Sequence, residues 1–167
     1  ITRAVFIVGG RLNQKPVVVV SALSKVTDLL YRISDAAASG NSEETESLMA
    51  ELRSRHVNLA SELLEQSPMM KEEAVARVNH ICDKLADLVR AVCAVRELSD
   101  RNKAIIISNG EILSSTIICF TMNAKGIRTN WIDAREMMIT SNNYLKGEPN
   151  EKEILSRVPS IVEEAYD

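Results

Sequence analysis

The run of four valines at residues 17–20 constrains the fold of this chain more than any other stretch of its sequence. A short β-branched run that follows a proline predicts a strand buried on both faces, as in a parallel sheet. A small polar turn, residues 21–25, comes next, and apolar residues with helical spacing begin at Val26. A helix N-terminus at such a turn presents free N–H groups and the positive end of its dipole. The turn is therefore either a ligand site reaching to Thr27 or an ordinary strand-to-helix connection. Its residues alone favour the second interpretation.

Apolar residues at steps of three and four predict a series of helices in the middle of the chain. The pattern at residues 26–38 predicts the first of them. Asn41 and Glu44 have the spacing of a capping box, which opens a second, amphipathic helix. Ser67 and Pro68 have the order of an N-cap and a first helical residue, and the helix that they begin would be about 30 residues long. We expect the two longer helices to form a helical hairpin.

The second half of the chain contains the remaining predicted strands. The sequence predicts a loop at residues 99–102 and strands at residues 127–132 and 137–140. Residues 104–108, AIIIS, fit a strand by their composition, whereas the segment after them fits a helix that could include them. Pro159 would kink or split the last predicted helix. The alternation of strands and helices predicts an α/β protein with a mostly parallel sheet.

Composition and charge argue against several classes of partner. The net charge of −3 and the 4% aromatic content argue against a nucleic-acid surface, which needs basic and stacking side chains. We find no apolar run of membrane-spanning length and no signal peptide pattern, so we expect a cytoplasmic protein without a membrane partner.

The cysteines and histidines form no recognisable catalytic or metal-binding pattern. Cys82, Cys93 and Cys119 are an odd number without a C-x-x-C pair, which predicts buried free thiols. His56 and His80 lie in separate helical patterns, where each is predicted to be structural or exposed rather than catalytic. We therefore expect no metal site.

Three segments together resemble the aspartokinases of the amino acid kinase superfamily. They are VVVVSALSKVTDLL at residues 17–30, SNGEILSS at residues 108–115 and GIRTNWIDAREMMIT at residues 126–140. Each segment alone is a weak signal, but their order, with a helical stretch between the first two, is specific. The resemblance spans essentially the whole chain. It implies an α/β fold, the three-layer αβα sandwich of the carbamate kinase-like type, here a partial N-terminal lobe with a long helical hairpin. It also implies that residues 104–108 are helical, since in the family they lead into the Gly-Glu segment.

The resemblance implies that residues 1–167 are part of an amino acid kinase domain, namely its aspartate-binding lobe. The family's opening Lys-Phe-Gly-Gly segment, with a catalytic lysine, is expected upstream of Ile1. The nucleotide-binding half and the regulatory domains are expected downstream. The implied reaction of the parent protein transfers the γ-phosphoryl group of ATP to the β-carboxylate of L-aspartate, the first step towards lysine, threonine and methionine. ATP and Mg²⁺ are expected as cofactors of that parent, a homo-oligomer, whereas this chain alone is expected to be inactive and to bind neither.

Four residues match substrate-binding positions of the family: Ser21, Ala22, Thr27 and Glu111. Ser21 and Ala22 match the turn that meets the substrate, and Thr27 matches a substrate-contacting threonine at the helix start. Glu111 matches the glutamate that pairs with the substrate ammonium, as expected of a carboxylate facing an α-amino group. Without the resemblance, Thr27 would be a simple N-cap and Glu111 a solvated helix residue.

Other positions of the family pattern are either structural or altered. Asp133 and Arg135 match a family motif, and we interpret them as an ion pair that ties a strand to a turn. The sequence departs from the pattern at Lys25, where glycine is common, and at Asn109, where an aromatic residue or histidine is common. Residues 143–146 replace the usual D-N-F-G sequence. These departures bear on fine specificity.

Two alternatives remain open. The first is another member of the amino acid kinase superfamily with a different substrate, against which the D-A-R-E sequence after Trp131 argues. The second is a non-catalytic helical interaction module that has the amino acid kinase fold. It predicts that surface changes on the long helices matter, whereas changes at Thr27 and Glu111 do not.

Overall fold

The computed structural model describes residues 1–144 and 146–166 of the chain. It divides into two compact units, Ile1–Thr129 and a second unit that begins at Asn130, and each is described by itself. Two residues lie outside the described ones: Leu145, within the predicted 143–146 sequence, and Asp167, the last residue of the predicted domain.

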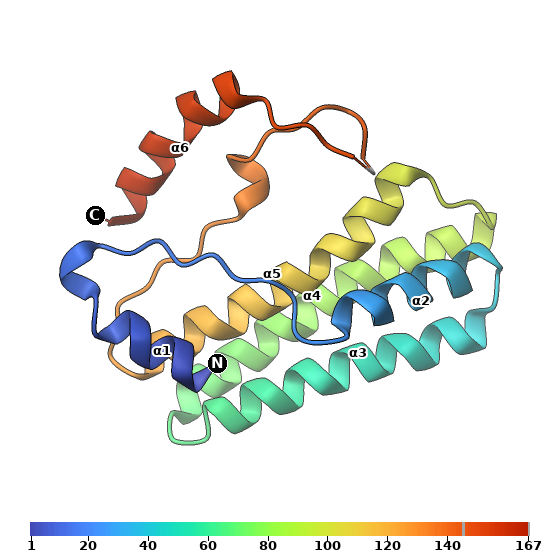
Figure 1. Ribbon diagram of the computed structural model, residues 1–167. Coiled ribbons are helices and arrows are strands. Elements are labelled where there is room, and N and C mark those ends of the chain that lie inside the picture. The colour runs from blue at the N-terminus through green and yellow to red at the C-terminus, as the bar shows by residue number, and fades with distance from the viewer. Residues whose placement is uncertain (145, 167) are drawn as a thin grey trace. The chain divides into compact units, whose positions relative to one another are not determined.

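Helices account for the regular secondary structure of the described residues. The first unit contains α1 (Thr2–Gly9), the short 3₁₀ helix η1 (Leu12–Gln14), α2 (Val26–Ala38), α3 (Ser42–Leu63), α4 (Pro68–Val95) and α5 (Asp100–Ala124) (Figure 1). The second unit contains the 3₁₀ helix η2 (Ala134–Glu136) and α6 (Glu151–Tyr166).

The described residues contain no β-strand, so the predicted α/β fold with its three-layer αβα sandwich is wrong for this structure. The β-type pairing recorded among these residues is an isolated bridge between Thr140 and Pro149. Residues 17–20 run without ladder hydrogen bonds, and the Val19 side chain is 92% exposed rather than buried. A β-branched run becomes a strand only when a second extended segment satisfies its N–H and C=O groups. The described part of the chain does not provide that partner.

The two later predicted strands, residues 127–132 and 137–140, are wrong for the same reason, since neither forms a ladder within the described residues. The last predicted helix is present as α6. Pro159 lies inside α6 and does not split it.

The region before the Gly-Glu segment is more helical than its residues predict. Residues 99–102, predicted as a loop, instead contain the start of α5. The Ser99 hydroxyl accepts a hydrogen bond from the N–H of Asn102 at 3.2 Å and so caps this helix. Residues 104–108 are helical, as the family resemblance implied.

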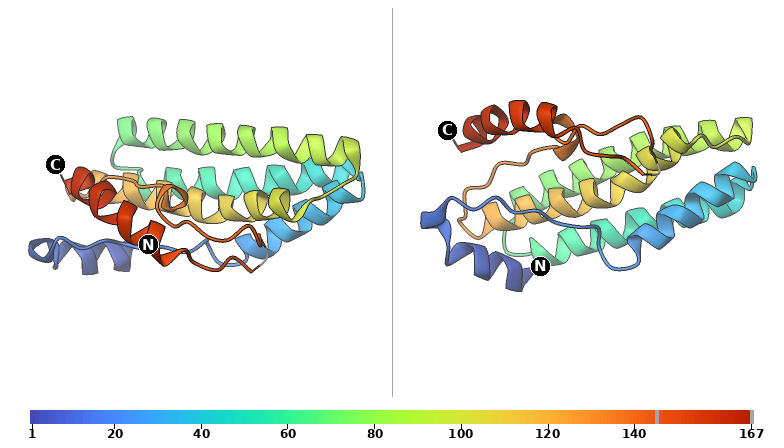
Figure 2. Two further views of the ribbon diagram at one scale, coloured as in Figure 1. Left: turned by 90° about the horizontal axis from the view of Figure 1, so that it is seen from above. Right: turned by 45° about the horizontal axis from the view of Figure 1, so that its top comes forward.

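Helices α2, α3, α4 and α5 pack against one another as a bundle (Figures 1 and 2). The bundle has a continuous apolar core. Within it α3 and α4 form the predicted helical hairpin. The largest fully buried aliphatic side chains of this core are Leu30, Ile33, Leu52, Leu64, Ile106, Leu113 and Ile117. Burying one such side chain contributes roughly 1.5–3 kcal/mol. Helix packing therefore stabilises this unit without any sheet.

The predicted start of α3 is confirmed by its hydrogen bonds. The N–H of Glu44 donates to Oδ1 of Asn41 at 3.2 Å, and the Glu44 carboxylate accepts a hydrogen bond from Nδ2 of Asn41 at 2.9 Å. The two side chains thus satisfy each other as well as a free N–H of the first helical turn.

His56 is a buried polar residue of this core, whereas His80 is exposed. Nδ1 of His56 lies 2.7 Å from the carbonyl oxygen of Leu52, and Nε2 has no hydrogen-bond partner among the described residues. Burial lowers the pKa of His56 below its ordinary value of 6.5, because the charged imidazolium would lose its hydration. His56 is therefore a neutral core residue.

The composition of α5 passes the length and hydropathy test for a membrane-spanning helix, contrary to the prediction from the sequence. Half of its most apolar 18-residue stretch is buried within the protein. A core helix of a bundle passes the same test, and α5 packs against α2, α3 and α4. Packing in the core therefore accounts for its apolar character.

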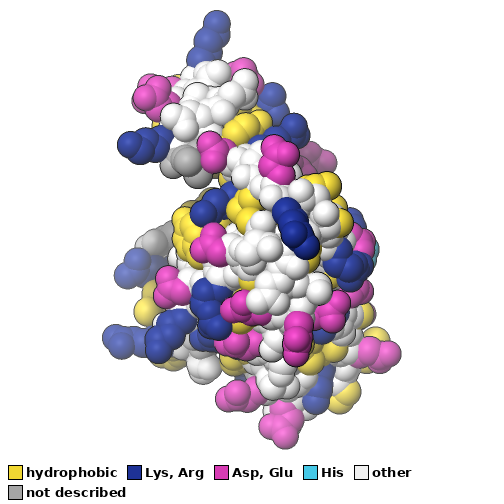
Figure 3. All heavy atoms as spheres, turned by 90° about the vertical axis from the view of Figure 1, so that its right-hand side faces the viewer, with side chains coloured by type: hydrophobic (Ala, Val, Ile, Leu, Met, Phe, Trp, Pro, Cys, Tyr) yellow, Lys and Arg dark blue, Asp and Glu magenta, His cyan; other side chains and the backbone are white. Residues whose placement is uncertain are grey.

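Charged side chains of both signs are intermixed on the face drawn in Figure 3. One local pair within the first unit is Arg53 with Asp83, whose side-chain nitrogen and oxygen lie 2.6 Å apart. The intermixing agrees with the small net charge of −3.

Candidate functional site

The turn that precedes α2 is joined to α5 by two hydrogen bonds between residues far apart in the sequence. The backbone N–H of Ala22 donates to Oε1 of Glu111 at 3.1 Å, across 89 positions. The Ser114 hydroxyl donates to the carbonyl oxygen of Ser21 at 2.8 Å. Glu111 and Ser114 have helical spacing and so lie on one side of α5. The peptide unit between Ser21 and Ala22 is thus held at both its C=O and its N–H.

Gly110 permits this close approach of the turn to α5. A Cβ atom at Gly110 would lie 2.9 Å from Cβ of Ala22 and 3.2 Å from Cδ1 of Leu30. Real Cβ atoms essentially never show contacts under 3.0 Å, so a side chain at this position would push the turn away. Close packing of the turn against α5 therefore explains why a glycine precedes Glu111. It lets the carboxylate reach the backbone of the turn.

The other end of the turn is held by α3 and by the start of α2. Nη2 of Arg55 donates to the carbonyl oxygen of Ser24 at 2.5 Å, and the N–H of Val26 donates to the carbonyl oxygen of Leu23 at 2.9 Å. Lys25 has φ = 63° and ψ = 4°, in the left-handed region. A non-glycine residue adopts this conformation at a cost in free energy. This gives a physical reason for the glycine that the family pattern has at the position of Lys25.

Several backbone N–H groups of the turn face no internal acceptor. Those of Leu23, Ser24 and Lys25 have none among the residues that the structure describes, and Ser24 and Lys25 are exposed. Successive N–H groups around a left-handed residue form a concavity that attracts anions, and the start of α2 adds its dipole. The turn can therefore hold a carboxylate, while Glu111 can attract a cation.

The structure brings three of the four predicted site residues together. Ser21, Ala22 and Glu111 meet where the turn contacts α5. Thr27 is half-buried in the first turn of α2, and within the described residues no hydrogen bond joins its side chain to Glu111. The N-cap of α2 is Lys25, so Thr27 is not the simple N-cap that its residue type alone predicts. Thr27 borders the free N–H groups rather than the carboxylate.

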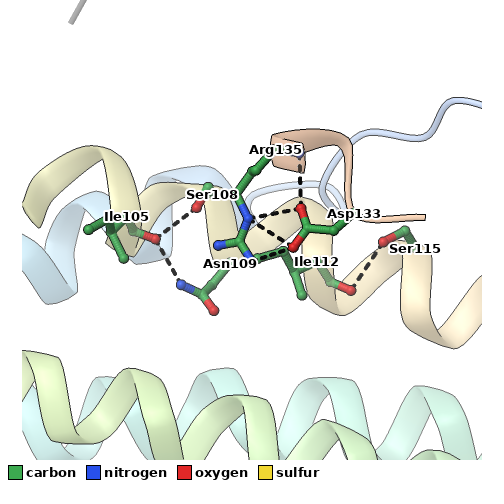
Figure 4. Close-up of polar contacts among 7 residues, drawn as sticks. All are labelled: Ile105, Ser108, Asn109, Ile112, Ser115, Asp133 and Arg135. Atoms are coloured by element: carbon green, nitrogen blue, oxygen red, sulfur yellow. Dashed lines mark hydrogen bonds and ion pairs between the residues drawn. The ribbon is translucent and has the colours of Figure 1, made fainter. Parts of the chain in front are cut away.

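Asp133 and Arg135 form the predicted ion pair, within the second unit (Figure 4). Nη2 of Arg135 lies 2.5 Å from Oδ2 of Asp133, and Nε lies 2.9 and 3.1 Å from the two carboxylate oxygens. The hydrogen bonds from Arg135 lower the pKa of Asp133 below its ordinary value of 3.8. The carboxylate also accepts the N–H of Arg135 at 3.0 Å and so caps η2. The pair closes a local turn, although no strand adjoins it in the described structure.

Ser108 and Asn109 turn their side chains back onto α5 (Figure 4). The Ser108 hydroxyl and Nδ2 of Asn109 both donate to the carbonyl oxygen of Ile105, at 2.9 and 2.8 Å. These hydrogen bonds leave the contact between Glu111 and the Ala22 N–H to the Glu111 side chain.

A hollow of about 460 Å³ lies elsewhere in the first unit, between α3 and α4. Apolar side chains such as Met49, Val57 and Val89 line it, and Arg53 at its wall already donates to Asp83 at 2.6 Å. The hollow offers apolar packing space but few free polar groups for a charged small molecule. The candidate site is therefore the turn beside Glu111, where a carboxylate and free N–H groups lie together.

Three residues that shape this site were not predicted from the sequence: Gly110, Ser114 and Arg55. Ser114 follows Glu111 by three positions within the SNGEILSS segment, so helical spacing is a signal that identifies it, whereas Gly110 directly precedes Glu111 and has no such spacing. Arg55 lies outside all three family segments and has no such signal. Its contact with Ser24 depends on the packing of α3 beside α2.

No family model matches this sequence. Curated proteins do match it. The chain is 24% identical over 164 residues to the chloroplastic bifunctional aspartokinase/homoserine dehydrogenase 2 of Zea mays, a match that covers 93% of this chain. It is 26% identical over 160 residues to the chloroplastic aspartokinase 1 of Arabidopsis thaliana, again over 93% of this chain. It is 27% identical over 139 residues to the aspartokinase of Chlamydia muridarum, over 83% of this chain.

These matches cover most of this chain but only a small part of each relative. The chain spans 18% of the maize protein, 26% of the Arabidopsis protein and 28% of the chlamydial protein. The relatives agree with the family that the three segments predict. The chain is therefore homologous to the aspartokinases and the bifunctional aspartokinase/homoserine dehydrogenases.

Proposed function

We propose that this chain supplies the aspartate-binding part of an aspartate kinase, which phosphorylates the β-carboxylate of L-aspartate to give 4-phospho-L-aspartate. The observation that carries the proposal is the 3.1 Å hydrogen bond from the Ala22 N–H to Glu111. It joins two of the three segments that resemble the family into one site. The aspartokinase relatives, which match most of the chain, support the same reaction class.

Glu111 would bind the α-ammonium group of the substrate. Its Oε1 accepts the Ala22 N–H, and no partner of Oε2 is recorded in the described part of the chain, which leaves that oxygen for the ligand. A charge-assisted hydrogen bond between carboxylate and ammonium is among the stronger polar contacts in proteins. Because Ala22 already orients the carboxylate, little reorganisation is needed when the substrate binds.

The turn would bind a carboxylate of the same substrate. The free N–H groups of Leu23, Ser24 and Lys25 supply hydrogen-bond donors, and the hydroxyls of Ser21 and Thr27 flank them. Donors for an anion therefore lie close to an acceptor for a cation. This arrangement fits a zwitterionic amino acid better than a neutral molecule.

We assign none of the described residues a role in binding the cofactors ATP and Mg²⁺. No group of three or more His, Cys, Asp or Glu side chains that could hold a metal ion occurs among them. We therefore assign no step of phosphoryl transfer to this chain. We propose that the nucleotide site and the catalytic lysine belong to the rest of the complete protein, a cytoplasmic homo-oligomer.

The test is to supply the complete native protein with L-aspartate and ATP-Mg and to trap the acyl phosphate with hydroxylamine. Glu111→Gln should lower kcat/KM for aspartate by roughly 100-fold, because it removes the charge opposite the ammonium. Glu72→Gln, a change at an exposed position of α4, is the matched control and should leave kcat/KM unchanged. Absence of aspartyl hydroxamate with the wild-type protein would overturn the proposal.

The two alternatives give different results in the same assay. Another amino acid kinase would turn over a different amino acid faster than aspartate in competition. A non-catalytic helical module would show no turnover, and Thr27→Ala and Glu111→Gln would then leave partner binding unchanged.

A further inference from the structure

We propose that Arg55 is a positioning residue for the substrate turn: from α3 it orients the Ser24–Lys25 peptide so that the Lys25 N–H faces the ligand. This inference rests on the proposed function, because it concerns how the same turn binds the carboxylate of its substrate. Arg55 itself would not touch the substrate.

The contact that carries this role is short and charge-assisted. Nη2 of Arg55 donates to the carbonyl oxygen of Ser24 at 2.5 Å, and Arg55 is half-buried. Hydrogen bonds from a charged donor are stronger than those between neutral groups. The contact spans 31 positions and crosses from α3 to the turn before α2.

Because of the geometry of the peptide bond, the contact between Arg55 and the Ser24 carbonyl also determines the direction of the Lys25 N–H. In a trans peptide the C=O and the N–H of the same plane point in opposite directions. Drawing the Ser24 carbonyl towards Arg55 therefore aims the Lys25 N–H away from Arg55. That N–H has no acceptor within the described residues, so it is available to an anion. The left-handed conformation of Lys25, with φ = 63°, belongs to the same local arrangement.

The turn is held from two helices, and Arg55 is the anchor on one of them. Ser114 of α5 fixes the Ser21 carbonyl at 2.8 Å, and Arg55 of α3 fixes the Ser24 carbonyl at 2.5 Å. The residues between these two carbonyls carry the N–H groups of the proposed carboxylate site. A shift of α3 relative to α5 would rotate these peptides. The helical bundle is therefore coupled to substrate affinity through one arginine.

Arg53 provides a matched control on the same helix. It is also half-buried, but its guanidinium donates to Oδ1 of Asn79 at 3.0 Å and to Asp83 at 2.6 Å, both on α4. Removing Arg53 disturbs the pairing of α3 with α4 and leaves the contact with Ser24 in place. A purely structural role of α3 arginines would make the two positions equivalent.

The experiment compares Arg55→Ala, Arg55→Lys and Arg53→Ala in the complete native protein by steady-state kinetics. Arg55→Ala should raise KM for aspartate by about 10- to 100-fold, the effect of losing a hydrogen bond from a charged donor. Both kcat and the KM for ATP should change by less than about 2-fold, because the lost contact affects aspartate binding alone. Arg55→Lys should recover part of the aspartate affinity, since lysine also donates to a carbonyl.

Amide hydrogen exchange on the same proteins gives a readout that does not depend on turnover. Exchange at Val26 and Leu29, whose N–H groups donate to the carbonyl oxygens of Leu23 and Lys25, should accelerate in Arg55→Ala and stay unchanged in Arg53→Ala. The inference is overturned if KM for aspartate stays within about 2-fold in Arg55→Ala, or if Arg53→Ala raises it equally. If the wild-type protein shows no aspartate-dependent turnover, the proposed function fails. Hydrogen exchange then decides alone whether Arg55 positions the turn, and unchanged exchange in Arg55→Ala rejects that role.

Discussion

The N–H of Ala22 and the carboxylate of Glu111 are 3.1 Å apart although 89 positions separate them in the chain. The hydrogen bond between them joins the turn before α2 to the middle of α5. A carboxylate that accepts a backbone N–H is oriented before any ligand arrives, which limits the entropy lost on binding. The contact also makes the turn sensitive to changes on α5 next to Glu111.

The first such change is Gly110→Ala. The added Cβ would lie 2.9 Å from Cβ of Ala22, so the turn must move. Overpacking costs about 1–3 kcal/mol, and alanine regains at most about 1 kcal/mol of helix propensity, so we expect the free energy of unfolding to fall by about 1–2 kcal/mol. Urea unfolding measures the change. Gly9→Ala is the control, because a Cβ there would meet Ile127 at an ordinary 3.4 Å. Equal stability of the two variants would contradict the packing argument.

Lys25→Gly should stabilise the fold. Lys25 has φ = 63°, a conformation that costs a non-glycine residue about 1–2 kcal/mol, and part of this gain is offset by the greater freedom of glycine in the unfolded chain. We expect a gain of up to about 1 kcal/mol in thermal or urea unfolding. Lys25→Ala removes the charge but keeps the strained backbone, so it should give no gain. Equal stabilisation by alanine would mean that the lysine charge, not the backbone, is responsible.

The stability of the bundle should depend on pH through His56. Burial lowers its pKa in the folded state below 6.5, so the unfolded chain binds the proton more readily. His56 therefore does not reduce the free energy of unfolding above pH 6.5. Below that pH its protonation in the unfolded chain lowers the free energy of unfolding, by at most about 1.4 kcal/mol per pH unit. His56→Leu should remove most of this slope between pH 7 and pH 5, measured by urea unfolding. His80 is exposed, so His80→Gln should leave the slope unchanged. Asp133 titrates below 3.8, outside this interval.

The three cysteines should differ in their reaction with iodoacetamide. Cys82 is fully buried, and burial raises the pKa of its thiol from 9.0 to about 11. Cys93 is half-buried. Because only the thiolate reacts, Cys82 should be alkylated far more slowly than Cys93 at pH 8 in the native protein. Mass spectrometry of the peptides measures the rates, and all three cysteines should react alike in concentrated urea. Native alkylation of Cys82 at the rate of Cys93 would contradict the burial of Cys82.

The helices could be predicted from local patterns because their hydrogen bonds close within the segment. Asn41 and Glu44 indicated the start of α3, and Pro68 indicated the start of α4. Residues 104–108 show the limit of local patterns. Their β-branched composition fits a strand, and they are helical because they continue into the rest of α5, which packs against α2, α3 and α4.

The site could be predicted in part. The family resemblance predicts Ser21, Ala22 and Glu111 as site residues, and hydrogen bonds join the turn at Ser21 and Ala22 to α5 at Glu111 and Ser114. No local pattern predicts Arg55, because its contact with Ser24 depends on the side-by-side packing of α3 and α2.

The sequence by itself determined the helical segments, their caps and the segments that identify the aspartokinase relatives, because each depends on residues near one another in the chain. Only the tertiary structure decided that residues 17–20 remain unpaired, since a strand exists through the hydrogen bonds of a neighbour. Only the tertiary structure decided how the turn is held. The approach of Ala22 to Gly110, and the contacts of Ser21 and Ser24 with two different helices, arise when the bundle buries its core.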